Sequence, residues 1–175
     1  MKLTKFLSVA VIAILSLSIS SCNKEADPII LTGSWQLDPS ATFLQIIYNP
    51  TYAEMYPSAI QYLKDNKEKI LTEIKKPDII QFSDPNVVDF IYTSPLAPTV
   101  TGTFDQFEIY VNIKNALFPT GIAGASNNHK LEIYYTKDYM MSILYSILTP
   151  EDDSQDTFSK LIEQFDGVGV YVRAQ

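Results

Sequence analysis

Strict alternation of apolar and polar residues marks two adjacent strands near the middle of the chain. Residues 99–104 alternate threonines with Val100, Gly102 and Phe104. Residues 107–114 alternate in the same way, and their apolar members are Phe107, Ile109, Val111 and Ile113. Because a period of two is typical of strands and Asp105-Gln106 suits a tight turn, the pattern predicts an antiparallel hairpin.

Similar alternation predicts further strands on both sides of this hairpin. The predicted strands cover residues 31–37, 78–83, 86–92, 131–136 and 168–172. Residues 43–48 are aromatic and irregular, and we expect a short strand or a helical turn there. Residues 116–128 contain Gly121 and Gly124 without clear alternation, so we expect a long loop.

Three segments have the longer period of amphipathic helices. The first, residues 58–75, has an apolar stripe and a charged opposite face. The second begins at Asp138 and is apolar nearly all round. The third begins at Thr149-Pro150 and carries apolar residues as far as Phe165, and Gly167 is expected to end it. The pattern predicts an α+β domain: an antiparallel β-barrel or strongly curved meander with an inserted helix and C-terminal helices.

The first 22 residues follow a different pattern, which is that of an export signal. Lys2 and Lys5 precede an apolar run over residues 6–19, and two serines separate that run from Cys22, the single cysteine. The apolar run is shorter than the roughly 20 residues that a membrane-spanning helix needs. A buried core helix would be unusual at this place, because the polar stretch 23–28 follows it.

This segment resembles a bacterial lipoprotein signal, with Ile19-Ser20-Ser21-Cys22 as its lipobox. The resemblance implies cleavage before Cys22 and attachment of diacylglycerol to its sulfur. We therefore expect a signal peptide over 1–21, a tether over 22–30 and one folded domain over 31–175. The expected location is the bacterial cell envelope, at the outer membrane, with the lipid on Cys22 as the membrane contact.

The folded part is similar in layout to lipocalins and related calycin barrels. Gly33-Ser34-Trp35 matches their Gly-x-Trp, in which the tryptophan packs across one end of the barrel. Gly102-Thr103-Phe104 is similar to a hairpin motif of bacterial lipocalin-like lipoproteins. The chain departs from that family because it inserts a helix over 58–75 and shows about seven convincing strands, against roughly eight in a closed barrel. A partial, a flattened and a filled barrel therefore stay open as alternatives.

Composition and charge limit the possible partners. The full chain has 13 basic and 20 acidic residues, with a net charge of −7, and no basic cluster. A nucleic-acid partner is therefore not expected. The two lysines of the signal are lost on cleavage, so the mature chain is more acidic still.

The sequence offers no convincing catalytic constellation. His129, the single histidine, lies in a polar turn without an obvious nucleophile or orienting partner. Asp152, Asp153 and Asp156 suit the first turn of a helix better than a calcium loop, whose glycine and terminal glutamate are missing. We expect no enzyme activity, no catalytic residue, no metal and no cofactor.

Tyrosines on the predicted strands are the candidate ligand contacts. Tyr110, Tyr134 and Tyr171 share the more polar faces of their strands. They could stack on a ligand if they point into a barrel, or they could be ordinary outward-facing tyrosines. Trp35 is assigned a structural role. The expected function is non-catalytic binding of a small hydrophobic or amphipathic ligand; the alternative is a protein-interaction or scaffold lipoprotein of the envelope with a filled core.

Overall fold

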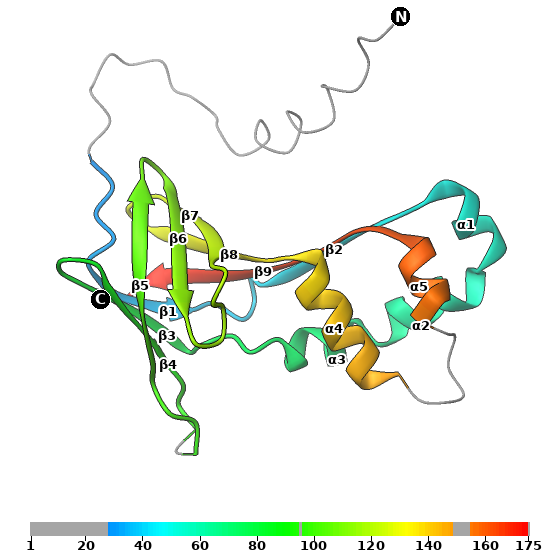
Figure 1. The fold of residues 1–175 in the computed structure, drawn as a ribbon, viewed down its shortest axis with the longest axis horizontal. Coiled ribbons are helices and arrows are strands. Elements are labelled where there is room, and N and C mark those ends of the chain that lie inside the picture. The colour runs from blue at the N-terminus through cyan, green and yellow to red at the C-terminus, as the bar shows by residue number, and fades with distance from the viewer. Residues whose placement is uncertain (1–27, 95, 149–154, 175) are drawn as a thin grey trace, which may run out of the picture.

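The protein folds into a closed antiparallel β-barrel that carries a group of short helices on one side (Figure 1). The computed structural model describes residues 28–94, 96–148 and 155–174. Eight strands form the ring in the order β1 (Gly33–Leu37), β3 (Ile79–Ser83), β4 (Val87–Ile91), β5 (Val100–Phe107), β6 (Tyr110–Asn115), β7 (Ile122–Ser126), β8 (Lys130–Tyr135) and β9 (Ile162–Arg173). The α+β class and the barrel are thus confirmed, and the ring is complete.

The long strand β9 closes the barrel. One of its edges pairs with β8, while residues 171–173 at its other edge pair with β1. The first part of the same edge pairs with β2 (Phe43–Tyr48), which lies beside β9 beyond the end of β1. The β2–β9 ribbon therefore extends out of the barrel toward the helices, as Figure 1 shows.

Five short helices are present in the described part of the chain. They are α1 (Pro50–Met55), α2 (Pro57–Asp65), α3 (Lys67–Glu73), α4 (Lys137–Ile147) and α5 (Gln155–Leu161). Helices α4 and α5 pack on β9, and α3 contacts both α4 and β2. The approach is close at Gly167, where a Cβ would lie 2.8 Å from the sulfur of Met140. No helix among the described residues is both long and apolar enough to cross a membrane.

The single helix expected over 58–75 is divided into two. Helix α2 ends at Asp65 and α3 begins at Lys67. At Asn66 between them, the side-chain Nδ2 donates to the carbonyl oxygen of Tyr62, which also accepts the ordinary helical bond from the Asn66 backbone N–H. This side-chain bond gives the backbone an alternative to continuing the helix.

The hairpin is present, but its turn lies three residues later than expected. Strand β5 continues through Asp105-Gln106, and Phe107 pairs with Tyr110 around a turn made by Glu108 and Ile109. The longer ladder satisfies more backbone groups. As a result Phe107 does not share the inner face with Val111, as the alternation had suggested, but points outward.

Two other expectations are wrong. The loop expected over 116–128 contains β7, because Ile122–Ser126 pairs with β6 and β8 on its two sides. The last helix ends at Leu161, and Phe165 and Gly167 belong to β9. Pairing with β2, and for Gly167 also with β8, supplies these residues with backbone partners that a helix would have supplied locally. The expected start of that helix, Thr149-Pro150, lies outside the described residues.

Large side chains fill the barrel and close one of its ends. The ring of Phe82 contacts that of Phe104 edge-on at 4.9 Å between centroids, and Phe82 lies diagonally across the β1–β3 ladder from the buried Trp35. The indole Nε1 of Trp35 donates to the carbonyl oxygen of Leu31 at 2.8 Å. The opposite end of the barrel faces α3 and α4, and charged, hydroxyl and aromatic side chains meet there.

Candidate functional site

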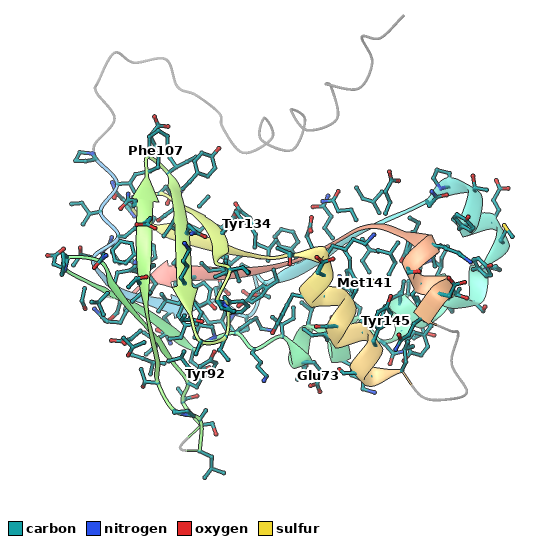
Figure 2. The ribbon with its side chains drawn as sticks, viewed as in Figure 1. Glu73, Tyr92, Phe107, Tyr134, Met141 and Tyr145 are labelled. Atoms are coloured by element: carbon teal, nitrogen blue, oxygen red, sulfur yellow. The ribbon has the colours of Figure 1, made fainter. Side chains whose placement is uncertain are left out.

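A hollow of about 320 Å³ lies between α3, α4 and the loop that connects β6 to β7. Its lining includes Glu73, Lys75, Phe118, Tyr139, Ile143 and Ser146. Figure 2 shows Glu73 at the end of α3, beside α4. The hollow therefore combines apolar walls with a few charged and hydroxyl groups, as small-molecule sites do.

Aromatic rings connect this hollow to the interior of the barrel. Phe118 and Tyr139, which line the hollow, have ring centroids 5.6 Å apart. Beneath them Tyr135 lies 6.0 Å from Phe118 and stacks on Tyr139 at 5.5 Å. Phe90 lies 6.3 Å from Phe118 on the far side of this cluster. The side chains are thus continuous from the hollow to the inner wall.

Behind the rings that line the hollow, three buried tyrosine hydroxyls make no well-formed hydrogen bond to any described residue. They belong to Tyr92, Tyr135 and Tyr171, and the Nδ2 of Asn115 is likewise buried without a partner. Tyr135 and Tyr171 are almost completely buried. A buried polar atom left unpaired costs about 1–3 kcal/mol, so such a group needs a bound molecule or another specific explanation.

Burial also determines the ionisation of these tyrosines. It raises the pKa of Tyr92 to about 12, with additional effects from Tyr139 and Asp78. Burial raises the pKa of Tyr135 and of Tyr171 well above the usual value. A weak hydrogen bond between the hydroxyls of Tyr135 and Tyr171 further raises the pKa of Tyr135 and lowers that of Tyr171, but its geometry is poor and leaves both hydroxyls incompletely satisfied. All three are neutral hydroxyls at pH 7, each able to donate one hydrogen bond and to accept others.

The structure separates the three tyrosines that the sequence put forward. Tyr171 lies inside the barrel, opposite Leu131 in the register of β8 and β9. Tyr110 and Tyr134 face outward: Tyr110 is 56% exposed, and the Tyr134 hydroxyl donates to a carboxylate oxygen of Glu132 at 2.8 Å. In the sequence, Val168, Val170 and Val172 suggested that the valines of β9 point inward and that Tyr171, which alternates with them, points outward. The structure has the reverse: the valines are on the outer side of β9 and Tyr171 is on the inner side.

Sequence reasoning did not put forward Tyr92, Tyr135 or Tyr139 as site residues. A signal for Tyr135 was present, because it alternates with Leu131 and Ile133, which are buried inside. Tyr139 could be found only from the placement of α4. It accepts a hydrogen bond from the backbone N–H of Lys75 at 3.1 Å, which ties α4 to the end of α3.

The other residues considered from the sequence lie away from this hollow. Trp35 is fully buried at the opposite end of the barrel, and His129 is exposed in the turn between β7 and β8. Cys22, Asp152 and Asp153 lie outside the described residues. Within the described part, no group of three His, Cys, Asp or Glu side chains could hold a metal ion.

A second, larger hollow of about 440 Å³ lies at the tryptophan end, lined by Pro28, Ile30, Asn128 and Arg173. Its polar side chains already have partners: Arg173 donates to the carbonyl oxygen of Thr32 and Asn128 accepts from the backbone of Ile30. We therefore take the hollow at the helical end, with its unpaired hydroxyls, as the candidate binding site. No protein-family model, curated protein or solved structure matches this chain.

Proposed function

We propose that this protein binds a small amphipathic ligand, without catalysis, in the hollow between α3, α4 and the β6–β7 loop. The observation that carries the proposal is the set of buried hydroxyls of Tyr92, Tyr135 and Tyr171, none of which makes a well-formed hydrogen bond to a described residue. A ligand whose polar group reaches them would supply the missing hydrogen bonds. A binding role without catalysis is supported by the groups at the inner end of the hollow, which are neutral hydroxyls and aromatic rings, while the charged Glu73 and Lys75 lie in its lining.

The same groups indicate the chemistry of the ligand. Neutral tyrosine hydroxyls and the Nδ2 of Asn115 can all donate, so a carbonyl, ether or carboxylate oxygen suits them. Phe118, Tyr139 and Ile143 would contact an apolar portion that occupies the hollow. A ligand with one oxygen-bearing end and an apolar body fits both halves.

We further propose that the protein is a lipoprotein of the bacterial outer membrane, anchored through Cys22. This part of the proposal is supported by the order of charge, apolar run and cysteine over 1–22. Several acyl chains hold a domain firmly, since each buried methylene contributes roughly 0.8 kcal/mol. Cys22→Ser should therefore move the protein out of the membrane fraction, and persistence there would contradict the proposed anchor.

Native mass spectrometry of the unlipidated Cys22→Ser chain tests ligand binding. We expect co-purified small molecules, and stabilisation against heat by fatty acids or bile-type amphiphiles. Tyr135→Phe/Tyr171→Phe should stay folded and lose this stabilisation, because only the hydroxyls are removed. Tyr110→Phe/Tyr134→Phe removes two outward hydroxyls and serves as the matched control. Absence of both bound molecules and a thermal shift would refute ligand binding.

The packed barrel interior favours the alternative function, a protein-interaction or scaffold role in the envelope. Trp35, Phe82 and Phe90 are among the large side chains that are fully buried. Under this alternative, native mass spectrometry would show the chain without a bound small molecule, and amphiphiles would not raise its unfolding temperature. The chain would instead capture a specific envelope protein. The mass and heat measurements thus separate the two functions.

A further inference from the structure

The tip of the β5–β6 hairpin exposes three large apolar side chains. Phe107 is 72% exposed, Tyr110 is 56% exposed and Ile109 is 41% exposed. We call these three residues the apolar tip. Figure 2 shows Phe107 at the end of the hairpin, pointing away from the barrel. Apolar groups gathered at one protruding place mark contact surfaces more often than isolated ones do.

The start of the described chain is hydrogen-bonded to this hairpin and to the β7–β8 turn. The side-chain Nε2 of Gln106 donates to the carbonyl oxygen of Ile29 at 3.0 Å. Asn128 accepts from the backbone N–H of Ile30 and donates to the carbonyl oxygen of Pro28. Figure 1 shows this first segment, in blue, beside the β5–β6 hairpin. Ile30 is itself 58% exposed and adds apolar surface there.

We propose that the apolar tip docks onto the surface of a phospholipid bilayer. This inference rests on the proposed anchor, because the distance from Cys22 to Pro28 limits how far the tip can lie from the acyl chains. A chain of roughly six residues spans at most about 20 Å. Pro28 is held at the hairpin end of the barrel, so an anchored molecule keeps its apolar tip within reach of the membrane interface.

The composition of the apolar tip suits an interface with zwitterionic lipids. Tyrosine and phenylalanine pack their rings at the headgroup level, where the tyrosine hydroxyl stays hydrated. Asp105 precedes the tip, Glu108 lies in the turn between Phe107 and Ile109, both are exposed, and the whole chain has a net charge of −7. Anionic lipid would be repelled, so contact depends on the apolar side chains.

Docking in this orientation also determines where the candidate binding site lies relative to the bilayer. Strand β6 runs from Tyr110 at the apolar tip to Asn115 at its other end. The loop that follows Asn115 carries Phe118, which lines the hollow. The hollow therefore lies at the opposite end of this strand from the bilayer. A ligand would be taken from the aqueous side and not directly from the membrane.

Quenching of tryptophan fluorescence by brominated acyl chains tests the docking. The full lipidated chain is reconstituted in brominated phosphatidylcholine vesicles as Phe107→Trp and, separately, as Leu96→Trp. Leu96 is the matched control because it is 93% exposed and lies in the loop at the other end of β5. The buried Trp35 contributes the same background to both. We expect several-fold stronger quenching for Phe107→Trp, and equal quenching would overturn the proposal.

A mass measurement separates this inference from the proposed anchor. If the chain carries lipid but Phe107→Trp is quenched no more than Leu96→Trp, docking is refuted and the anchor stands. If the chain carries no lipid but Phe107→Trp is selectively quenched at high vesicle concentration, docking stands and the anchor falls. In the Cys22→Ser chain, Phe107→Ser/Ile109→Ser/Tyr110→Ser should lower vesicle binding about tenfold. Concentration-dependent dimerisation that this triple variant abolishes would instead assign the tip to a second copy and overturn docking.

Discussion

The guanidinium of Arg173 lies over the ring of Trp35, 4.6 Å from its centre. The two residues also face each other in the ladder between β9 and β1, where the barrel closes. Arg173 further donates to the backbone carbonyl oxygens of Thr32, Ile30 and Asn128. One side chain therefore joins the last strand, the segment before the first strand and the β7–β8 turn.

Arg173→Lys should destabilise the fold although it keeps the charge. An ammonium cannot stack as a planar guanidinium does, nor reach three carbonyl oxygens in one plane. We expect the free energy of unfolding to fall by roughly 1–3 kcal/mol, measured by urea denaturation. Lys114→Ala, at an exposed position of β6, is the control and should change it by less than about 0.5 kcal/mol.

Trp35→Ala should be more severe. The indole is fully buried, and truncation of a buried aromatic side chain costs about 3–5 kcal/mol. The same denaturation experiment measures the loss. A change below about 1 kcal/mol would mean that the side chain does not support the barrel end.

Gly33→Ala tests why a glycine precedes the tryptophan. Gly33 has a φ of +118°, and an added Cβ would lie 3.1 Å from Nη1 of Arg173. Backbone strain of this kind costs on the order of 1–3 kcal/mol. We expect a lower midpoint of thermal unfolding, whereas Thr32→Ala at the neighbouring exposed position should leave the midpoint nearly unchanged.

The buried tyrosines predict a loss of stability in alkali. Their pKa values are higher in the folded protein than the value near 10 of the unfolded chain. Their contribution is therefore fully present below pH 10 and is lost as the pH rises through the folded values, which begin at about 12 for Tyr92. Urea denaturation between pH 8 and pH 11 should show this decline. Tyr92→Phe should make the decline smaller, and an unchanged slope would contradict the assignment.

The start of α1 predicts a smaller, local effect. The side-chain Oδ1 of Asn49 accepts from the backbone N–H groups of Thr51 and Tyr52. Asn49→Ala should therefore lower the free energy of unfolding by about 1 kcal/mol. Asn49→Asp keeps the acceptor at the helix N-terminus and should restore the stability.

Alternation was sufficient to predict β3, β4, β8 and most of the β5–β6 hairpin, because one face of each strand is buried. It failed for β7, whose residues are mostly small. A Cβ on Gly124 would lie 2.5 Å from the carbonyl oxygen of Glu132, and Ala125 lies opposite Tyr110. The neighbouring strands lie so close at these positions that only small residues fit. Small residues show no alternation of large apolar and polar side chains, so the sequence carries no strand pattern there.

The candidate site was less predictable than the strands. Tyr171 was named from the sequence, but its inward direction follows from the register with Leu131 on β8. The hollow itself depends on the hydrogen bond from Lys75 to Tyr139, which joins segments 64 residues apart. No local pattern carries such information, since it arises from the packing of α4 across β9 and α3.

Closure of the barrel by β9 has a consequence for the order in which the strands can pair as the chain is synthesised. The strand that completes the ring follows all the others in sequence, and it supplies partners to β1, β2 and β8 at once. One edge of β1 can pair with β3 early, but its other edge has no partner until β9 is made, and such distant pairings form slowly. The barrel therefore cannot close until β9, the last strand of the chain, has been made.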